Sequence, residues 1–263
     1  MSSLRERFFE YGKLDDCPVY DLHGHMGPFF GAHLPWCDPD AVVRAMDRAN
    51  VWMLVFCHHA AIMSPDIGNL ANIEAVRMHP NRLRAYCGIN PNYPYIIEKD
   101  VQSYADYPDV YVGLKFHADF HGISITDDRN TPAWELADSR GLPILLHTWD
   151  GSGGNGGQQV REMAEKYPNA KILMGHSIHG NWDAAIDLAN TFPNVHFELT
   201  AVPDERGVLE KFVEKSGSEK IFFGTDFPWF DFHYYIGAIL GAEINDEDRR
   251  NIFYRNAQRL LGL

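Results

Sequence analysis

The stretch VWMLVFC at residues 51–57 is a continuous apolar run in which polar and apolar residues do not alternate. A strand with one solvated face alternates, whereas a strand buried on both faces, as in a parallel sheet, does not. The preceding residues 38–50 have a helical pattern, in which Asp38 suits the N-cap and Pro39 suits the first helical position. This stretch and its flank therefore predict a parallel sheet covered by helices.

The alternation of strand-like and helix-like segments continues along the chain. Further strand-like runs occupy residues 19–25, 82–90, 110–117, 143–147, 171–176, 195–200 and 220–226. Helical patterns occupy residues 68–79, 95–105, 131–140, 158–166, 182–189, 206–215 and 246–261. Such alternation indicates an α/β fold with a parallel sheet, either an open doubly wound sheet or a closed barrel. Eight strand-like runs favour a (β/α)8 TIM barrel, which we expect as a single domain over residues 1–263.

Length and charge exclude several classes of protein. The chain has 263 residues, close to the ~250 of a typical barrel of this kind. Its formal net charge of -13 argues against binding to nucleic acid or to an anionic membrane surface, because both require a basic face. We see neither an apolar signal segment nor a run near the ~18 apolar residues of a membrane span. We therefore expect a cytoplasmic protein that acts on a small molecule, and a homodimer is compatible with the sequence.

The chain has four cysteines, which form no CxxC pair. So few cysteines in a chain of this length do not indicate a disulfide framework. We expect buried free thiols in a reducing compartment.

Polar side chains stand where several of the apolar runs end. His23 and His25 are two residues apart, which in a strand places both rings on the same side. His147, His176 and Asp226 each end a later run. Because the carboxyl ends of parallel barrel strands meet at one face, these residues should converge there. Nitrogen and oxygen donors of this kind suit Zn²⁺ or Mn²⁺, so the pattern predicts a metal site.

The motifs DLHGHMG, GLKFH, GLPILLHT, ILMGHS, FFGTDFPW and NAQRLLGL together resemble the amidohydrolase-2 branch of the amidohydrolase superfamily. The resemblance implies a metal-dependent TIM barrel with one divalent ion, zinc as the first choice and manganese as the second. It implies that the ion is held by His23, His25, His147 and Asp226. His176 would then either support a metal ligand from behind or polarise the substrate. Lys115 and His117, which strand alternation places on one face, would line the pocket.

Lys115 leaves a second arrangement open. Its position resembles that of the carboxylated lysine that bridges two ions in binuclear members of the superfamily, and His147 and His176 could then hold a second ion. The local sequence KFH resembles the mononuclear branch more closely, so we expect one ion and a free ammonium. An ordinary ion pair inside the barrel is the structural alternative for this lysine.

Two reactions fit these residues. The favoured one is hydrolysis of a small carbonyl substrate, such as a lactone, cyclic ester or amide, through a metal-bound hydroxide. Asp226 would act as the base, and His176 and Lys115 would stabilise the negative charge. The alternative is non-oxidative decarboxylation of a small aromatic or unsaturated carboxylic acid, in which Asp226 protonates the carbon. A catalytically silent metal-binding barrel is disfavoured because no expected ligand is missing.

Loops at the same end of the expected barrel supply further candidates. The segment GSGGNGG at residues 151–157 is either a mobile active-site loop or a passive linker. Aromatic residues and histidines in these loops would either enclose a flat substrate or form a packed apolar lid. They are His33, Trp36, His58, His59, Trp149, Trp229 and Phe230.

Overall fold

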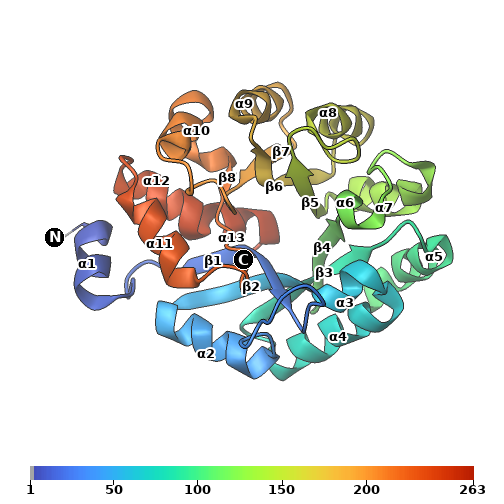
Figure 1. Ribbon diagram of the computed structural model, residues 1–263, viewed down its shortest axis with the longest axis horizontal. Helices are drawn as coiled ribbons and strands as arrows, with labels where there is room; N and C mark the ends of the chain where they lie inside the picture. The colour runs from blue at the N-terminus through green and yellow to red at the C-terminus, as the bar shows by residue number, and fades with distance from the viewer. Residues whose placement is uncertain (1–2) are drawn as a thin grey trace.

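The computed structural model describes residues 3–263 and shows eight parallel strands ringed by helices (Figure 1). Each strand pairs with the next strand in chain order, so the predicted (β/α)8 TIM barrel is confirmed. The strands are Val19–Met26 (β1), Val51–His58 (β2), Leu83–Ile89 (β3), Tyr111–Phe116 (β4), Pro143–Trp149 (β5), Lys171–His179 (β6), Val195–Glu198 (β7) and Ile221–Phe222 (β8).

Helices cover the outside of the barrel (Figure 1). The α-helices are Leu4–Tyr11 (α1), Pro39–Ala49 (α2), His59–Met63 (α3), Pro65–Met78 (α4), Pro94–Ser103 (α5), Ala118–His121 (α6), Thr131–Arg140 (α7), Gly157–Lys166 (α8), Trp182–Thr191 (α9), Val208–Ser216 (α10), Phe232–Gly241 (α11), Asp246–Arg250 (α12) and Asn256–Leu261 (α13). Short 3₁₀ turns lie at Tyr104–Asp106, Asp128–Asn130 and Ser218–Lys220, and a π-helical turn at Asn251–Arg255 joins α12 to α13.

Local sequence signals set several helix ends. The Asp38 side chain accepts a hydrogen bond of 2.9 Å from the amide of Ala41, which satisfies one of the free amides at the start of α2. Gly141, with φ 64°, ends α7 in the left-handed conformation that glycine adopts without strain. Both ends lie where the sequence predicts them.

The last strand is shorter than the sequence predicts. A strand over residues 220–226 was expected, but β8 covers only Ile221–Phe222. Asp226 has a φ of 60°, which lies outside strand geometry, and the backbone of this segment hydrogen-bonds directly to β1. The amide of Leu22 donates to Phe223, and the amide of Asp226 donates to His23. Residues 223–226 therefore help to close the barrel as an irregular wall that carries Asp226.

The sequence does not predict the helices α1 and α11. The α11 segment FHYYIGAILG is almost entirely apolar, so no polar stripe marks it as a helix, and much of it is buried. It packs against α1, which the sequence did not predict either (Figure 1). The predicted helix over residues 246–261 is interrupted by the π-helical turn, and its N-cap is Asn245.

All four cysteines are free in the structure. Cys17, Cys57 and Cys87 are buried, as expected, whereas Cys37 is partly exposed. No helix within residues 3–263 is both long and apolar enough to cross a membrane.

Candidate metal centre

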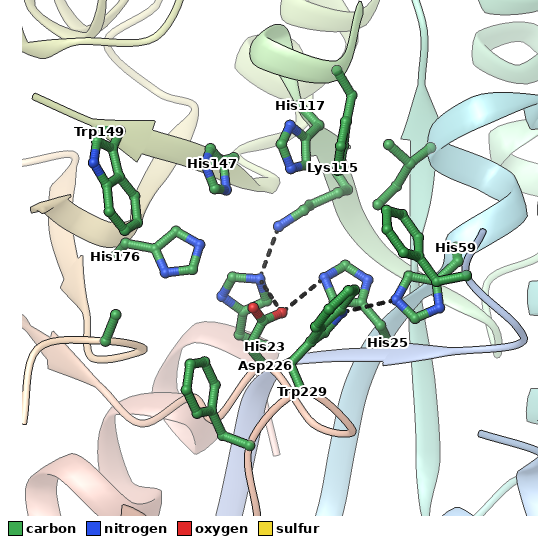
Figure 2. A pocket seen from close by; sticks show the side chains of 15 residues that line it. His23, His25, His59, Lys115, His117, His147, Trp149, His176, Asp226 and Trp229 are labelled. Atoms are coloured by element: carbon green, nitrogen blue, oxygen red, sulfur yellow. Dashed lines mark hydrogen bonds and ion pairs between the residues drawn. The ribbon is translucent and has the colours of Figure 1, made fainter. Parts of the chain in front are cut away.

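The predicted site residues line one cavity of about 440 Å³ at the carboxyl ends of the strands (Figure 2). β1, β5 and β6 provide four histidines, β4 provides the lysine and is followed directly by His117, and the segment after β8 provides the aspartate. The residues brought together are His23, His25, Lys115, His117, His147, His176 and Asp226. The side chains that the sequence predicts to converge at this face therefore line one cavity.

Both histidines of β1 are held by a partner behind the cavity. Nδ1 of His23 lies 2.8 Å from Oε2 of Glu198, and Nδ1 of His25 lies 2.8 Å from the carbonyl oxygen of Cys57. A carbonyl can only accept, so His25 donates through Nδ1. In the neutral ring this leaves a lone pair on Nε2, which faces the cavity. A ring fixed in this way is typical of metal-ligating histidines.

Asp226 meets the same two rings. Its Oδ1 lies 3.0 Å from Nε2 of His25 and 3.4 Å from Nε2 of His23, and it accepts no hydrogen bond of good geometry. A carboxylate oxygen and two imidazole lone pairs that face one another repel unless a positive charge joins them. This donor set of two nitrogens and one oxygen fits a divalent transition-metal ion.

The backbone is strained where two of the site residues sit. His176, Ser177 and Ile178 have φ values of 66°, 50° and 52°, and Asp226 has a φ of 60°. Non-glycine residues rarely occupy this left-handed region, and the β-branched Ile178 is especially disfavoured there. Strained residues of this kind cluster at functional sites, where the surrounding structure holds them in place.

Burial determines the protonation of the site. Removal from water holds the pKa values of His23 and His176 well below their usual range, and it lowers the pKa of His147 to about 3. Burial alone would raise the pKa of Asp226, but the positive charge that the His23 and His25 rings carry when protonated outweighs it and holds that pKa well below normal. At neutral pH the site thus offers neutral rings at His23, His147 and His176 and an ionised carboxylate at Asp226, the forms that bind metals.

Lys115 brings an amino group into this cluster. It is almost fully buried, and its Nζ lies 2.9 Å from Nε2 of His23 (Figure 2). Burial lowers the pKa of Lys115, and the nearby Asp226 counteracts that effect. The amino group of Lys115 therefore stands beside the predicted metal donors.

The remaining histidines surround this centre. Donor atoms of His23, His176 and Asp226 lie within 4.8 Å of one another, so the structure groups His176 with the donors more tightly than the resemblance implies. His147 stacks on His117 with ring centroids 4.1 Å apart, and its Nε2 is 3.6 Å from Oδ2 of Asp119. The buried Nδ1 atoms of His117 and His176 have no hydrogen-bond partner.

The metal affinity of two variants should show which of His147 and His176 is the stronger ligand. We expect His147→Ala to weaken metal binding more than His176→Ala, because Oδ2 of Asp119 lies 3.6 Å from Nε2 of His147 and helps to orient that ring, whereas Nδ1 of His176 has no hydrogen-bond partner. Competition with a chromophoric chelator measures both affinities on the same metal. A larger loss for His176→Ala would instead place His176 in the ligand set.

Glu198 is the buried residue that sequence interpretation missed. It ends β7, is fully buried, and contacts His23 from behind. The signal was present, because a carboxylate at the end of an apolar strand is costly unless it is paired. The residue follows the short run VHF, which contains a histidine of its own and did not stand out as a strand end.

The glycine-rich segment at residues 151–157 is anchored to the site. Ser152 Oγ donates to Oδ1 of Asp119 at 2.8 Å, and Asn155 Nδ2 donates to Oδ2 of the same carboxylate at 3.1 Å. Asp119 in turn lies beside His147. These contacts favour an active-site loop over a passive linker.

Aromatic side chains form the cavity walls. Phe29, Phe120, Trp149, Trp229 and Phe230 line it, and Phe29 lies edge-on to Trp229 with centroids 5.0 Å apart. His59 also lines the cavity, where its Nε2 accepts a 3.1 Å hydrogen bond from Trp229 (Figure 2). His33, Trp36 and His58 are not among the lining residues. The walls suit a small flat molecule.

Fold and site together define a TIM barrel with a candidate metal centre at the carboxyl ends of its strands. The sequence model of a family described as Amidohydrolase matches residues 110–263, more than half of the chain. The chain therefore belongs to the amidohydrolase family, as the motifs predicted. No curated protein matches the chain in a sequence search.

Solved structures share the fold at low sequence identity. A 5-carboxyvanillate decarboxylase from Novosphingobium aromaticivorans, complexed with manganese and 4-hydroxy-3-methoxy-5-nitrobenzoic acid, has a TM-score of 0.77 at 12% identity, over 94% of this chain and 97% of the other. A 2,6-dihydroxybenzoate decarboxylase from Rhizobium has 0.74 at 15%, over 94% and 99%. A putative amidohydrolase from Staphylococcus aureus has 0.72 at 14%, over 95% and 100%. At these identities the likeness establishes the fold.

Proposed function

We propose that this protein is a metal-dependent, non-oxidative decarboxylase of a small aromatic or unsaturated carboxylic acid. The observation that carries the proposal is the division of the cavity into two parts. Lys115 and the histidine–aspartate cluster form the polar floor of the cavity, and aromatic rings form the walls above this floor. A planar acid would place its carboxylate at the floor of the cavity and its ring between the walls.

The comparisons support this reaction over hydrolysis. Two of the structures described above are named as decarboxylases of aromatic acids, and one of them contains manganese. A hydrolase was the favoured prediction from the sequence, so the comparisons favour its alternative. We propose manganese or zinc as the ion, held by His23, His25, His147 and Asp226.

The metal, when bound, would supply positive charge that holds the substrate's oxygen atoms and withdraws electrons from the bond that breaks. Lys115 would donate a hydrogen bond to the substrate carboxylate and orient it. The aromatic walls would exclude water. Asp226, ionised at rest, would take up a proton during turnover and pass it to the carbon that loses carbon dioxide, so that R–COO⁻ and H⁺ give R–H and CO₂.

Hydrolysis remains the second candidate because of one observation. Asp226 is the only carboxylate among the residues that line the cavity, and its position beside His25 also suits a base that removes a proton from water. The substrate would then be a lactone or amide.

Product analysis in D₂O separates the two reactions. Metal-loaded protein is incubated with hydroxybenzoic acids, including 2,6-dihydroxybenzoate and 5-carboxyvanillate, and in parallel with a panel of lactones. We expect carbon dioxide and an aromatic product that carries one deuterium at the former carboxyl position, as detected by mass spectrometry. Ring opening of a lactone, with every aromatic acid unchanged, would support the hydrolase instead.

A further inference from the structure

We propose that Glu198 is a positioning residue that fixes the tautomer of His23, so that the Nε2 lone pair of this ring faces the metal centre. The inference rests on the metal centre of the proposed function. Its first test requires neither metal nor substrate. Glu198 is a fully buried carboxylate that does not line the cavity.

The surroundings of the Glu198 carboxylate consist of hydrogen-bond donors. Oε1 accepts from the amide and the hydroxyl of Thr200, at 2.8 and 2.7 Å. Oε2 accepts from the amide of His176 at 3.2 Å and lies 2.8 Å from Nδ1 of His23. Two carboxylate oxygens offer about four acceptor positions, and these four contacts use them. Burial raises the pKa of Glu198, but the backbone amides of His176 and Thr200 donate to its two oxygens and favour the acceptor form, so His23 donates through Nδ1.

The other side of the ring shows the complementary requirement. Nε2 of His23 lies 2.9 Å from Nζ of Lys115, and an ammonium has no acceptor. Nε2 must therefore be the acceptor, and the same lone pair would bind a metal ion. Glu198 and Lys115 thus specify one tautomer from opposite sides of the ring.

Gly224, which follows β8, leaves space for the contact between Glu198 and His23. A Cβ on Gly224 would lie 2.0 Å from Oε1 of Glu198 and 2.8 Å from Cβ of His23. Contacts that short do not occur, so any larger residue at 224 would push the carboxylate away from the ring. The chain therefore has a glycine at the point where the carboxylate and the ring meet the segment after β8.

The first experiment measures the tautomer directly. Protein with ¹⁵N-labelled histidine is stripped of metal, and the ring nitrogens are observed by NMR at neutral pH, with His23 assigned from a His23→Gln variant. Protonated and unprotonated ring nitrogens have well-separated shifts. We expect His23 to carry its proton on Nδ1. A proton on Nε2 in the wild type would overturn the proposal, whether or not any variant folds.

The second experiment removes the acceptor without changing its size. In Glu198→Gln, one end of the side chain becomes an NH₂ group that must face a donor. If the amide faces His23, the ring must accept through Nδ1 and carry its proton on Nε2. Lys115 opposes this tautomer from the other side of the ring. We expect the share of the Nε2-protonated form to rise above that of the wild type and the affinity for Zn²⁺, measured by chelator competition, to fall about 10- to 100-fold. Unchanged tautomer and affinity would contradict the proposal.

Asp21→Asn is the matched control. Asp21 is also a fully buried carboxylate, but it accepts from the amide of His23 and from Thr225 and touches no imidazole. We expect this variant to leave the tautomer of His23 and the Zn²⁺ affinity unchanged. An equal shift in the control would show that any buried carboxylate has the same effect, and would overturn the specific role of Glu198.

Discussion

Asp226→Asn is expected to lower kcat by about 10²- to 10⁴-fold, the usual contribution of a positioned acid or base. Asparagine keeps an oxygen that can contact the metal, but it cannot accept a proton at neutral pH. It also tolerates the left-handed backbone of this position, where φ is 60°. We therefore expect a folded protein that retains much of its metal. Steady-state kinetics and elemental analysis of the same preparation measure the two effects.

Asp231→Asn provides the matched control for that variant. Asp231 lies on the same connection between β8 and α11, is largely exposed, and caps α11 by accepting from the amide of His233 at 2.8 Å. Asparagine caps helices equally well, so we expect near-normal activity. A near-normal kcat in Asp226→Asn would remove Asp226 from the proton transfer.

Lys115→Met is expected to raise KM and lower kcat, with kcat/KM reduced by about 10- to 150-fold. The estimate corresponds to the loss of one hydrogen bond between charged groups, about 1.5–3 kcal/mol. Methionine keeps most of the buried volume of the side chain, so the effect reports the ammonium and not a new cavity. We expect about one metal ion per chain in both the wild type and the variant.

Lys220→Met controls for the loss of a lysine elsewhere. Nζ of Lys220 donates to the carbonyls of Ala189 and Phe192, at 2.8 and 3.1 Å, and does not line the cavity. This variant should affect stability and leave KM unchanged. If the wild type instead binds two ions and Lys115→Met binds at most one, Lys115 is a metal ligand and the mononuclear prediction is wrong.

The barrel was predictable because its strands are buried on both faces. Continuous apolar runs such as residues 51–57 differ from amphipathic helices in their pattern, and helix ends such as Asp38 and Gly141 have clear local signals. The elements that the sequence does not predict have neither a distinctive apolar pattern nor a clear signal at their ends. The segment of α11 is apolar on all sides, and residues 223–226 close the barrel with irregular backbone that no periodicity describes.

The site was predictable as a set of residues but not as a network. Parallel strands end at one face, so His23, His147 and His176 could be placed together from their positions alone. The sequence could not show that Glu198 contacts His23, because that contact depends on the register and curvature of the closed barrel. It also could not show that His176 lies as close to Asp226 as it does.

The division between strands and loops has a consequence for changing the specificity of this protein. The proposed donors His23 and His147 belong to strands, whereas Phe29, Phe120 and Trp229 belong to the segments that follow strands. We therefore expect that these three aromatic positions can be randomised while His23 and His147 keep their places. Under the proposed function, libraries that retain the strand ends should yield variants that accept larger or smaller aromatic acids.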